Sequence, residues 1–211
     1  MRNLILVLNF LVLFIFSNGV DVYEANRNSV VILKSKSKVG AGVFITAKGH
    51  ILTNYHVIKN TNDLEVIAKS SDLKNTSYKE FEILKIDETK DLALLKLLNT
   101  NTNFNFIQIS LVVPKIGSNS HAIGHPKGEE WSYSKGYIAQ KNKDYIWHYK
   151  DGSKMIGNTY QIQNPISKGN SGGPLLNDSG NLIGINTFIT KDDEALSYSI
   201  GVKDIIEFLA E

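Results

Sequence analysis

The chain has 211 residues, of which 42% are apolar and 21% are charged, and these proportions are ordinary for a folded globular protein. Its 23 basic and 21 acidic residues are scattered and leave a formal net charge of +2, so no dense basic stripe indicates nucleic-acid binding. The sequence contains no cysteine, which excludes disulfides, a thiol nucleophile and a cysteine-ligated zinc. The length allows one domain or two small lobes packed together.

The N-terminal segment has the features of a secretory signal peptide. Arg2 precedes a largely apolar run over residues 4–16, which is followed by small residues at Ser17 and Gly19. The run is shorter than the about 20 residues that a membrane span needs. We expect cleavage near Gly19, with Ala25 as a second option, and export to the periplasm or out of the cell. An uncleaved membrane anchor is the alternative.

Short apolar, β-branched runs separated by polar turns fill the first half of the chain. They predict strands at residues 29–33, 40–46, 51–54, 64–70, 80–86 and 92–97. After the third strand, Tyr55-His56-Val57-Ile58 leaves the sheet, and Asp91 stands directly before the last strand. Six short strands without a convincing helix predict an all-β sandwich or barrel.

The second half repeats this pattern after an Asn/Thr-rich connection at residues 99–105. Strands are predicted at residues 120–124, 133–140, 145–149, 153–163, 174–176, 182–188 and 195–200. Asp151-Gly152 is a hairpin turn signal. Apolar residues at helical spacing predict one C-terminal helix. The expected organisation is a signal peptide at 1–19, an N-terminal barrel at about 29–105, a second barrel at about 106–201 and a helix at 202–210.

One serine has the surroundings that a nucleophile needs. In Gly169-Asn170-Ser171-Gly172-Gly173 the glycines allow the backbone to bend sharply and to be approached closely. On composition alone, a simple turn between two strands is the favoured interpretation. A serine hydroxyl needs a base within hydrogen-bond reach, and this base needs a partner that holds its tautomer.

The order of residues along the chain restricts the kind of serine enzyme. All five histidines precede Ser171, at positions 50, 56, 121, 125 and 148. The α/β-hydrolases, including lipases and esterases, place the histidine after the serine, so the G-x-S-x-G elbow of that class is disfavoured here. The order histidine, acid, serine is the chymotrypsin-like one.

Five segments together resemble the trypsin-like serine protease domain of the HtrA/DegP type. They lie at residues 40–45 with 52–58, at 91–96, at 123–126, at 169–175 and at 182–187. The resemblance covers roughly residues 29–209, essentially the whole chain after the signal segment. It implies two six-stranded antiparallel β-barrels with a short C-terminal helix, and serine endopeptidase activity on extended or unfolded polypeptides. It calls for no cofactor and no metal.

The resemblance also assigns roles to particular residues. It implies that His56 is the general base and acid, that Asp91 orients it, and that Ser171 attacks the scissile carbonyl. The backbone N–H groups of Gly169 and Ser171 would form the oxyanion hole. Asp87 is a rival acid, but the matching motif has the aspartate directly before Leu-Ala-Leu-Leu. The alternative to these catalytic roles is a structural one, with His56 as a histidine at the end of a strand and Asp91 as a turn residue.

The other histidines have weaker claims. His121 and His125 have an H-x-x-x-H spacing, but Ala-Ile-Gly between them and Pro126 after them argue against the helix that would bring both to one metal. In the resembling family, His125 occupies a Gly-x-Pro turn without a catalytic role. His50 and His148 are expected in a turn and on the surface.

The residues at two positions argue against a preference for a charged residue at P1 of the substrate. Trypsin-like enzymes that cut after Lys or Arg carry an acid six residues before the serine, where this chain has Pro165. Glutamyl-specific relatives carry a histidine where this chain has Asn186.

The HtrA-like pattern instead implies an apolar pocket. It places Ile166 and Ile189 at the pocket, while Thr187, Phe188 and Ile189 offer main-chain hydrogen bonds to an extended peptide. We therefore expect a small-to-medium apolar P1 residue such as Val, Ala or Leu. The alternative is that both isoleucines belong to the core.

Three departures from the family pattern limit these expectations. Asn170 replaces the aspartate of zymogen-type enzymes, so activation by a freed N-terminus is not expected. The C-terminal PDZ domains typical of the family are not expected, because the sequence ends at Glu211, and an oligomer is left open but unsupported. Residues 140–158 have no clear match in the family. The alternation of Tyr145, Trp147 and Tyr149 in this segment predicts a half-buried strand, and the alternative is that these residues contact a partner or substrate.

The expected partner is a polypeptide substrate. Neither nucleic acid nor stable membrane association after signal cleavage is expected. The main rival hypothesis is a catalytically silent module that keeps the protease fold to bind peptides.

Overall fold

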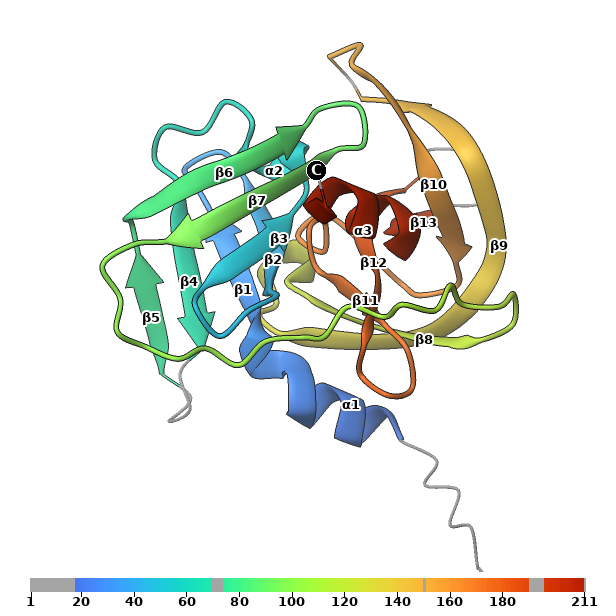
Figure 1. Cartoon of the computed structure of the whole chain (residues 1–211), viewed down its shortest axis with the longest axis horizontal. Helices are drawn as coiled ribbons and strands as arrows, with labels where there is room; N and C mark the ends of the chain where they lie inside the picture. The colour runs from blue at the N-terminus through green and yellow to red at the C-terminus, as the bar shows by residue number, and fades with distance from the viewer. Residues whose placement is uncertain (1–17, 70–73, 150, 190–195, 211) are drawn as a thin grey trace, which may run out of the picture.

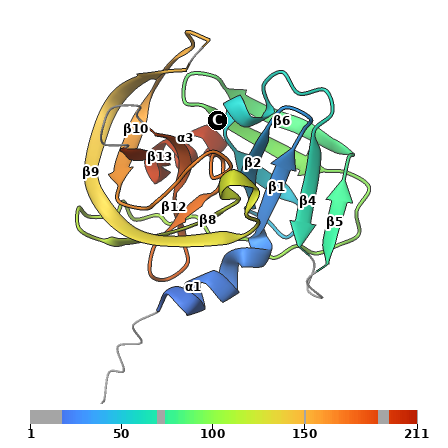
Figure 2. The same cartoon turned by 180° about the vertical axis from the view of Figure 1, so that it is seen from behind.

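The computed structural model describes residues 18–69, 74–149, 151–189 and 196–210, and the side chains of residues 188 and 189 are outside this description. Two antiparallel β-sheets lie side by side, as both views show (Figures 1 and 2). The helical segments are α1 (Gly19–Asn26), η1 (Arg27–Ser29), α2 (Tyr55–Ile58), η2 (Pro126–Gly128) and α3 (Val202–Ala210). Within the described ranges, no helix combines the length and the apolar character needed to cross a membrane.

The N-terminal sheet has seven described strands in the order β5-β4-β1-β2-β3-β7-β6. These are β1 (Val30–Lys34), β2 (Val39–Phe44), β3 (His50–Thr53), β4 (Glu65–Lys69), β5 (Asn75–Tyr78), β6 (Phe81–Asp87) and β7 (Leu92–Leu97). All six predicted strands are present. The seventh, β5, has the sequence Asn-Thr-Ser-Tyr and no apolar alternation, and it forms by pairing with β4.

The C-terminal sheet has six strands and closes on itself in the order β10-β13-β12-β11-β8-β9. They are β8 (Asn119–Gly124), β9 (Ser132–His148), β10 (Lys154–Ile162), β11 (Pro174–Leu176), β12 (Leu182–Ile189) and β13 (Ser197–Gly201). The all-β class and the C-terminal helix are thus confirmed. The two strands predicted at 133–140 and 145–149 are one continuous strand, β9, which pairs with β8 and then with β10.

Strand β1 is apolar on both faces because it serves two cores. Val31 and Leu33 pack inside the first sheet, whereas Val30 and Ile32 point into a cluster shared with the second sheet. This shared cluster takes Ala41, Val43, Leu52 and Leu92 from the first sheet, Ile123, Leu176, Leu182, Ile185 and Ile200 from the second, and Ile205 and Phe208 from α3. Asp91 directly precedes Leu92 of this shared cluster, and the Ser171 carbonyl accepts from the N–H of Ala41, another of its members.

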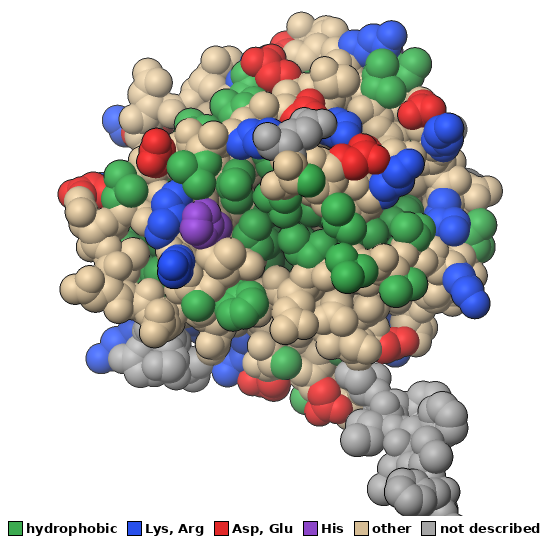
Figure 3. Space-filling model, viewed as in Figure 1, with side chains coloured by type: hydrophobic (Ala, Val, Ile, Leu, Met, Phe, Trp, Pro, Cys, Tyr) green, Lys and Arg blue, Asp and Glu red, His purple; other side chains and the backbone are tan. Residues whose placement is uncertain are grey.

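Helix α3 docks through an apolar face and one buried acid. Ile205 and Phe208 are fully buried, and Asp204 is only 1% exposed. The Asp204 carboxylate accepts hydrogen bonds from the Asn158 backbone N–H (2.6 Å) and side-chain amide (2.5 Å). On the face of the molecule seen in Figure 3, acidic and basic side chains are interspersed, in keeping with the small net charge.

Candidate active site

His56 lies on the short helix α2, which begins where the chain leaves β3. Its backbone N–H donates to Asp91 Oδ1 over 2.8 Å, and its ring Nδ1 lies 2.8 Å from Asp91 Oδ2. The imidazole side chain remains 25% exposed, so its other edge is open toward the surface. The Lys38 ammonium donates to the carbonyl oxygens of His56 (3.0 Å) and Lys59 (2.6 Å), which holds the end of this helix.

Asp91 is fully buried just before β7 and has a positive φ of 57°. Such backbone is uncommon for a residue other than glycine and needs support from its surroundings. The Asp91 carbonyl provides it, because it accepts from the Tyr55 N–H (3.1 Å) and the Asn54 side-chain amide (3.0 Å). The turn that presents the carboxylate is thereby tied to the residues that precede His56.

Ser171 lies on a turn that is bonded to both sheets. Its carbonyl accepts from the Ala41 N–H of β2 (2.8 Å), and the following Gly172 N–H donates to Asn186 of β12 (2.8 Å). The Ser171 hydroxyl donates to the Thr187 carbonyl over 2.9 Å. Within the described part of the chain, no hydrogen bond joins Ser171 to His56.

Thr187 brings the three predicted residues together. While its carbonyl accepts from Ser171, its hydroxyl donates to Asp91 Oδ2 over 2.9 Å, and Asp91 in turn contacts His56. Three residues that are far apart in sequence therefore lie around one threonine. The sequence analysis named Thr187 only for its main chain; the contact of its hydroxyl depends on how the two sheets meet, which no local motif encodes.

The backbone conformation and close packing around Ser171 explain why two of the neighbouring residues are glycines. Gly169 has a φ of +103°, and a Cβ there would lie 2.0 Å from the His125 carbonyl oxygen. Gly172 has a φ of +84°, and a Cβ there would lie 2.1 Å from the Ala41 carbonyl oxygen. The N–H groups of Gly169 and Ser171 donate to no acceptor in the described residues, so both are free to bind an incoming oxygen.

Tyr149 is a site residue that the sequence analysis did not identify as such. Its ring centroid lies 4.7 Å from that of His56, and its hydroxyl is 2.7 Å from Asp91 Oδ2, 2.9 Å from His56 Nδ1 and 3.0 Å from the Thr187 hydroxyl. Burial, and next the charge of Asp91, raise the pKa of the Tyr149 phenol far above its ordinary value, so the hydroxyl keeps its proton. The alternation of Tyr145, Trp147 and Tyr149 was the only signal in the sequence.

His125, for which the sequence predicts no catalytic role, is held at both ring nitrogens. It is buried, with Nε2 3.2 Å from the Val31 carbonyl oxygen, while Nδ1 accepts from the Trp131 N–H over 3.0 Å. Burial lowers the pKa of His125 to about 4. The neutral ring thus connects β1 of the first sheet with Trp131, and the His125 carbonyl is the group that leaves no room for a Cβ at Gly169.

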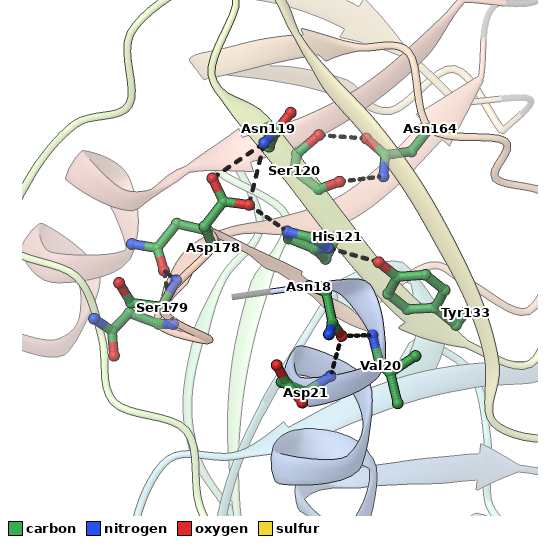
Figure 4. A network of polar contacts seen from close by, with 12 residues as sticks. Asn18, Val20, Asp21, Asn119, Ser120, His121, Tyr133, Asn164, Asp178 and Ser179 are labelled. Carbon is green, nitrogen blue, oxygen red and sulfur yellow. Dashed lines mark hydrogen bonds and ion pairs between the residues drawn. The ribbon is translucent and has the colours of Figure 1, made fainter. Parts of the chain in front are cut away.

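His121 belongs to a second histidine–aspartate pair, on β8 beside α1 (Figure 4). Its Nδ1 lies 2.7 Å from the Tyr133 hydroxyl and its Nε2 lies 3.0 Å from Asp178 Oδ1. The adjacent Ser120 hydroxyl donates instead to Asn164 (2.6 Å), and neither described contact of the His121 ring is to a serine. No cluster of three or more metal-ligating side chains occurs among the residues that the structure describes.

The predicted pocket residues are only partly described. Ile166 is half-buried and packs against the core of the second barrel. The side chains of Phe188 and Ile189 lie outside the described residues, although the backbone of both belongs to β12. A cavity of about 310 Å³ is lined by Pro126, Pro165, Asn170 and residues of β8 and β9, and not by Ile166.

Fold and sequence together define the class. Residues 40–185 match the trypsin-like peptidase domain, so the chain belongs to this family. Within it, its relatives are HtrA/Do serine proteases. The magnetosome formation protease MamE of Paramagnetospirillum magneticum is 34% identical over 156 residues, which are 74% of this chain and 21% of MamE. A probable periplasmic serine endoprotease, DegP-like, of Buchnera aphidicola subsp. Schizaphis graminum is 34% identical over 174 residues, 81% of this chain and 34% of that protein.

Solved structures support the same assignment. The crystal structure of Deg5 superimposes with a TM-score of 0.74 and 25% identity, and the match covers 89% of this chain and 90% of that one. The chain spans only about a fifth to a third of the length of the two relatives named above. The resemblance inferred from the five motifs is thus confirmed at the level of family and fold.

Proposed function

We propose that this chain is a serine endopeptidase that hydrolyses extended or unfolded polypeptides through His56, Asp91 and Ser171. The observation that carries the proposal is the gathering of these residues around Thr187, with the His56 ring held at 2.8 Å from a fully buried Asp91. A buried carboxylate beside Nδ1 fixes the tautomer whose Nε2 can accept the serine proton, and it stabilises the imidazolium that then forms.

The reaction follows from these contacts. His56 takes the Ser171 proton as the hydroxyl oxygen attacks the scissile carbonyl, and it then gives this proton to the leaving amine, which yields an acyl-enzyme that water hydrolyses. The unbonded N–H groups of Gly169 and Ser171 are suited to bind the developing oxyanion. A donor of this kind contributes about 2.7–4 kcal/mol in the transition state.

Before attack, the Ser171 hydroxyl has to leave the Thr187 carbonyl. We infer that the substrate brings this about, because β12 offers an edge for an added strand. Strand β11 begins at Pro174, opposite Ile185, so the backbone at residues 187–189 has no partner strand on that side among the described residues. A peptide lying there would donate its own N–H to the Thr187 carbonyl and release the hydroxyl toward His56.

The preferred P1 residue in this proposal is small-to-medium and apolar. Its support is the absence of a charged group at Pro165 and Asn186 and the apolar side chain of Ile166 packed on the second barrel. Digestion of a peptide library should give cleavage mainly after Val, Ala or Leu. Cleavage mainly after Lys, Arg or Glu would contradict the assignment of the pocket.

We also propose that the protein acts outside the cytoplasm. The DegP-like relatives are named as periplasmic, and the N-terminal segment has the composition of a signal peptide. Helix α1 favours cleavage near Gly19 over cleavage at Ala25. Val22 is buried in the shared cluster and the Tyr23 hydroxyl donates to the Trp131 carbonyl, so the later cut would remove residues that pack on the fold. The N-terminal mass of the exported protein decides between the two sites.

Covalent labelling tests the catalytic proposal. A fluorophosphonate should label the folded protein at one site, which tryptic mass spectrometry places on Ser171, and Ser171→Ala should abolish labelling and peptidase activity. Ser179→Ala, in an exposed turn of the same barrel, is the matched control and should label like the wild type. Correctly folded wild type that resists both labelling and turnover would instead favour the silent peptide-binding module.

A further inference from the structure

The hairpin of β9 and β10 reaches from the second barrel across to the catalytic histidine. Its outer end carries Tyr149, whose N–H donates to the Ser153 carbonyl (3.0 Å) and whose carbonyl accepts from the Gly152 N–H (3.0 Å). This turn is the one that Asp151-Gly152 predicted. Farther along β10, the Ile156 N–H donates to the Thr89 carbonyl of the first lobe (2.9 Å). The hairpin therefore bridges the two halves of the molecule next to the active site.

The Tyr149 hydroxyl has one proton and several neighbours that could take it. Asp91 Oδ2 is the nearest, at 2.7 Å, and it is the acceptor that carries charge. With this bond, Asp91 Oδ2 accepts from three side chains: the imidazole of His56, the hydroxyl of Thr187 and the phenol of Tyr149. The phenol ring also packs against the imidazole, with ring planes inclined by 40°. Tyr149 thus contacts both members of the pair that activates the serine, and within the described contacts it does not touch Ser171.

A salt bridge fixes the end of the hairpin to the helix of the catalytic histidine. The Lys59 ammonium donates to Asp151 Oδ2 (2.9 Å) and to the Ser153 hydroxyl (3.2 Å). Hydrogen bonds from Ser153 and the charge of Lys59 hold the pKa of Asp151 well below its usual value. Lys59 follows α2 directly and is three residues from His56. The same short segment therefore carries the base and anchors the residue that packs on it.

We propose that Tyr149 is a positioning residue for the His56–Asp91 pair, and that the Lys59–Asp151 anchor is what keeps it there. This inference rests on the proposed triad. It differs from a packing role because the phenol hydroxyl, and not only the ring, is required. Removing the hydroxyl leaves Asp91 Oδ2 with two donors in place of three, so the carboxylate and the imidazole lose one of the constraints on their orientation.

Kinetics separate this role from substrate binding. Tyr149→Phe should lower kcat about tenfold and leave KM within about twofold, since a hydrogen bond to a charged group that acts through the base affects the chemical step. Tyr137→Phe, at an exposed position of the same strand, is the matched control and should equal the wild type. An unchanged kcat in Tyr149→Phe, or a loss that appears only in KM, would overturn the proposal.

A double-mutant cycle tests the anchor. Lys59→Gln should lower kcat severalfold because it frees the hairpin end, whereas Lys59→Gln in the Tyr149→Phe background should lower it no further. If the two losses multiply, Lys59 does not act through Tyr149, and that part of the proposal fails.

A spectroscopic readout distinguishes this inference from the proposed function. The His56 Nδ1 proton, assigned by its absence in His56→Ala, should give a downfield proton NMR signal that shifts in Tyr149→Phe and stays in place in Tyr137→Phe. This shift requires no turnover, so an inert wild type with a shifting signal would reject the catalytic proposal and retain the role of Tyr149. A signal that does not move in Tyr149→Phe would reject the role of Tyr149 even in an active enzyme.

Discussion

At the scale of single residues, His125 shows how a buried histidine can link stability to pH. Both ring nitrogens are used in the neutral state, one near the Val31 carbonyl and one by the Trp131 N–H, so protonation would leave a buried charge. The folded protein therefore resists protonation of His125, and burial lowers its pKa to about 4. The unfolded chain takes up this proton near the ordinary pKa of about 6.5.

The stability should accordingly fall as the pH decreases from about 6.5 to about 4. In this window the unfolded state binds one more proton at this site than the folded state, and the difference costs about 1.4 kcal/mol per pH unit, or about 3 kcal/mol in all. Urea titrations at several pH values measure it. His125→Gln should be less stable near neutrality but should lose less on acidification; parallel curves for the two proteins would contradict this account.

Prediction from sequence was strongest for residues that belong to a local motif. His56, Asp91 and Ser171 each stand in a short recognisable segment, and the structure places all three around Thr187. Tyr149 has no such segment, because its contact with Asp91 arises only when a hairpin of the second sheet crosses to the first. Their catalytic roles remain proposals until Ser171 is labelled.

At the scale of secondary-structure elements, α3 depends on a buried acid as much as on its apolar face. Asp204 satisfies two N–H groups of Asn158 and lies 3.9 Å from the ammonium of Lys90, which also pairs with Glu207 (2.9 Å). The helix is thereby joined to β10 of the second barrel and to the turn before β7 of the first.

Asp204→Ala should destabilise the protein by about 2–4 kcal/mol, because it leaves two part-buried donors of Asn158 without an acceptor. Lys203→Ala, one residue earlier on the exposed side, removes only a surface pair and should change the free energy of unfolding by less than about 0.5 kcal/mol. Chemical denaturation of both variants compares them. Equal stabilities would show that α3 is held by its apolar face alone.

Strands were predictable where alternating or continuous apolar residues marked them. The errors fell on strand segments that consist of polar residues. The sequence Lys141-Asn142-Lys143-Asp144 looks like a connection, yet β9 continues through it because this part of the strand is largely exposed and pairs with β10. A register shift between Gly157 and Thr159 absorbs the irregularity. Helix α1 was missed because its sequence combines weak amphipathicity with a position beside the expected signal peptide.

At the scale of the whole molecule, the shared apolar cluster makes two sheets into one unit. It draws residues from both sheets and from α3, and β1 contributes one face to it and the other to the first core. Neither lobe can separate without exposing this surface to water, which costs roughly 25 cal/mol per Å².

Unfolding in urea should therefore proceed in a single transition. Tryptophan fluorescence, which reports Trp131 and Trp147 in the shared cluster, should coincide with far-UV circular dichroism, which reports both sheets. Two separated transitions would show that the lobes are independent. The length of the sequence was compatible with one domain or with two lobes. The shared cluster decides between them, and it could not be predicted because its apolar residues look like those of any hydrophobic core.

The hydrogen bond from Ser171 to the Thr187 carbonyl has a consequence for the chemical behaviour of the empty enzyme. Under the proposed mechanism, this hydroxyl is released when a peptide backbone competes for that carbonyl. Small electrophiles without an N–H, such as a fluorophosphonate, react with Ser171 only when its hydroxyl leaves Thr187 unaided, so they should label it more slowly than a peptide-based electrophile that can pair with β12. The empty enzyme therefore favours molecules that arrive as an extended strand, and unfolded chains can do so.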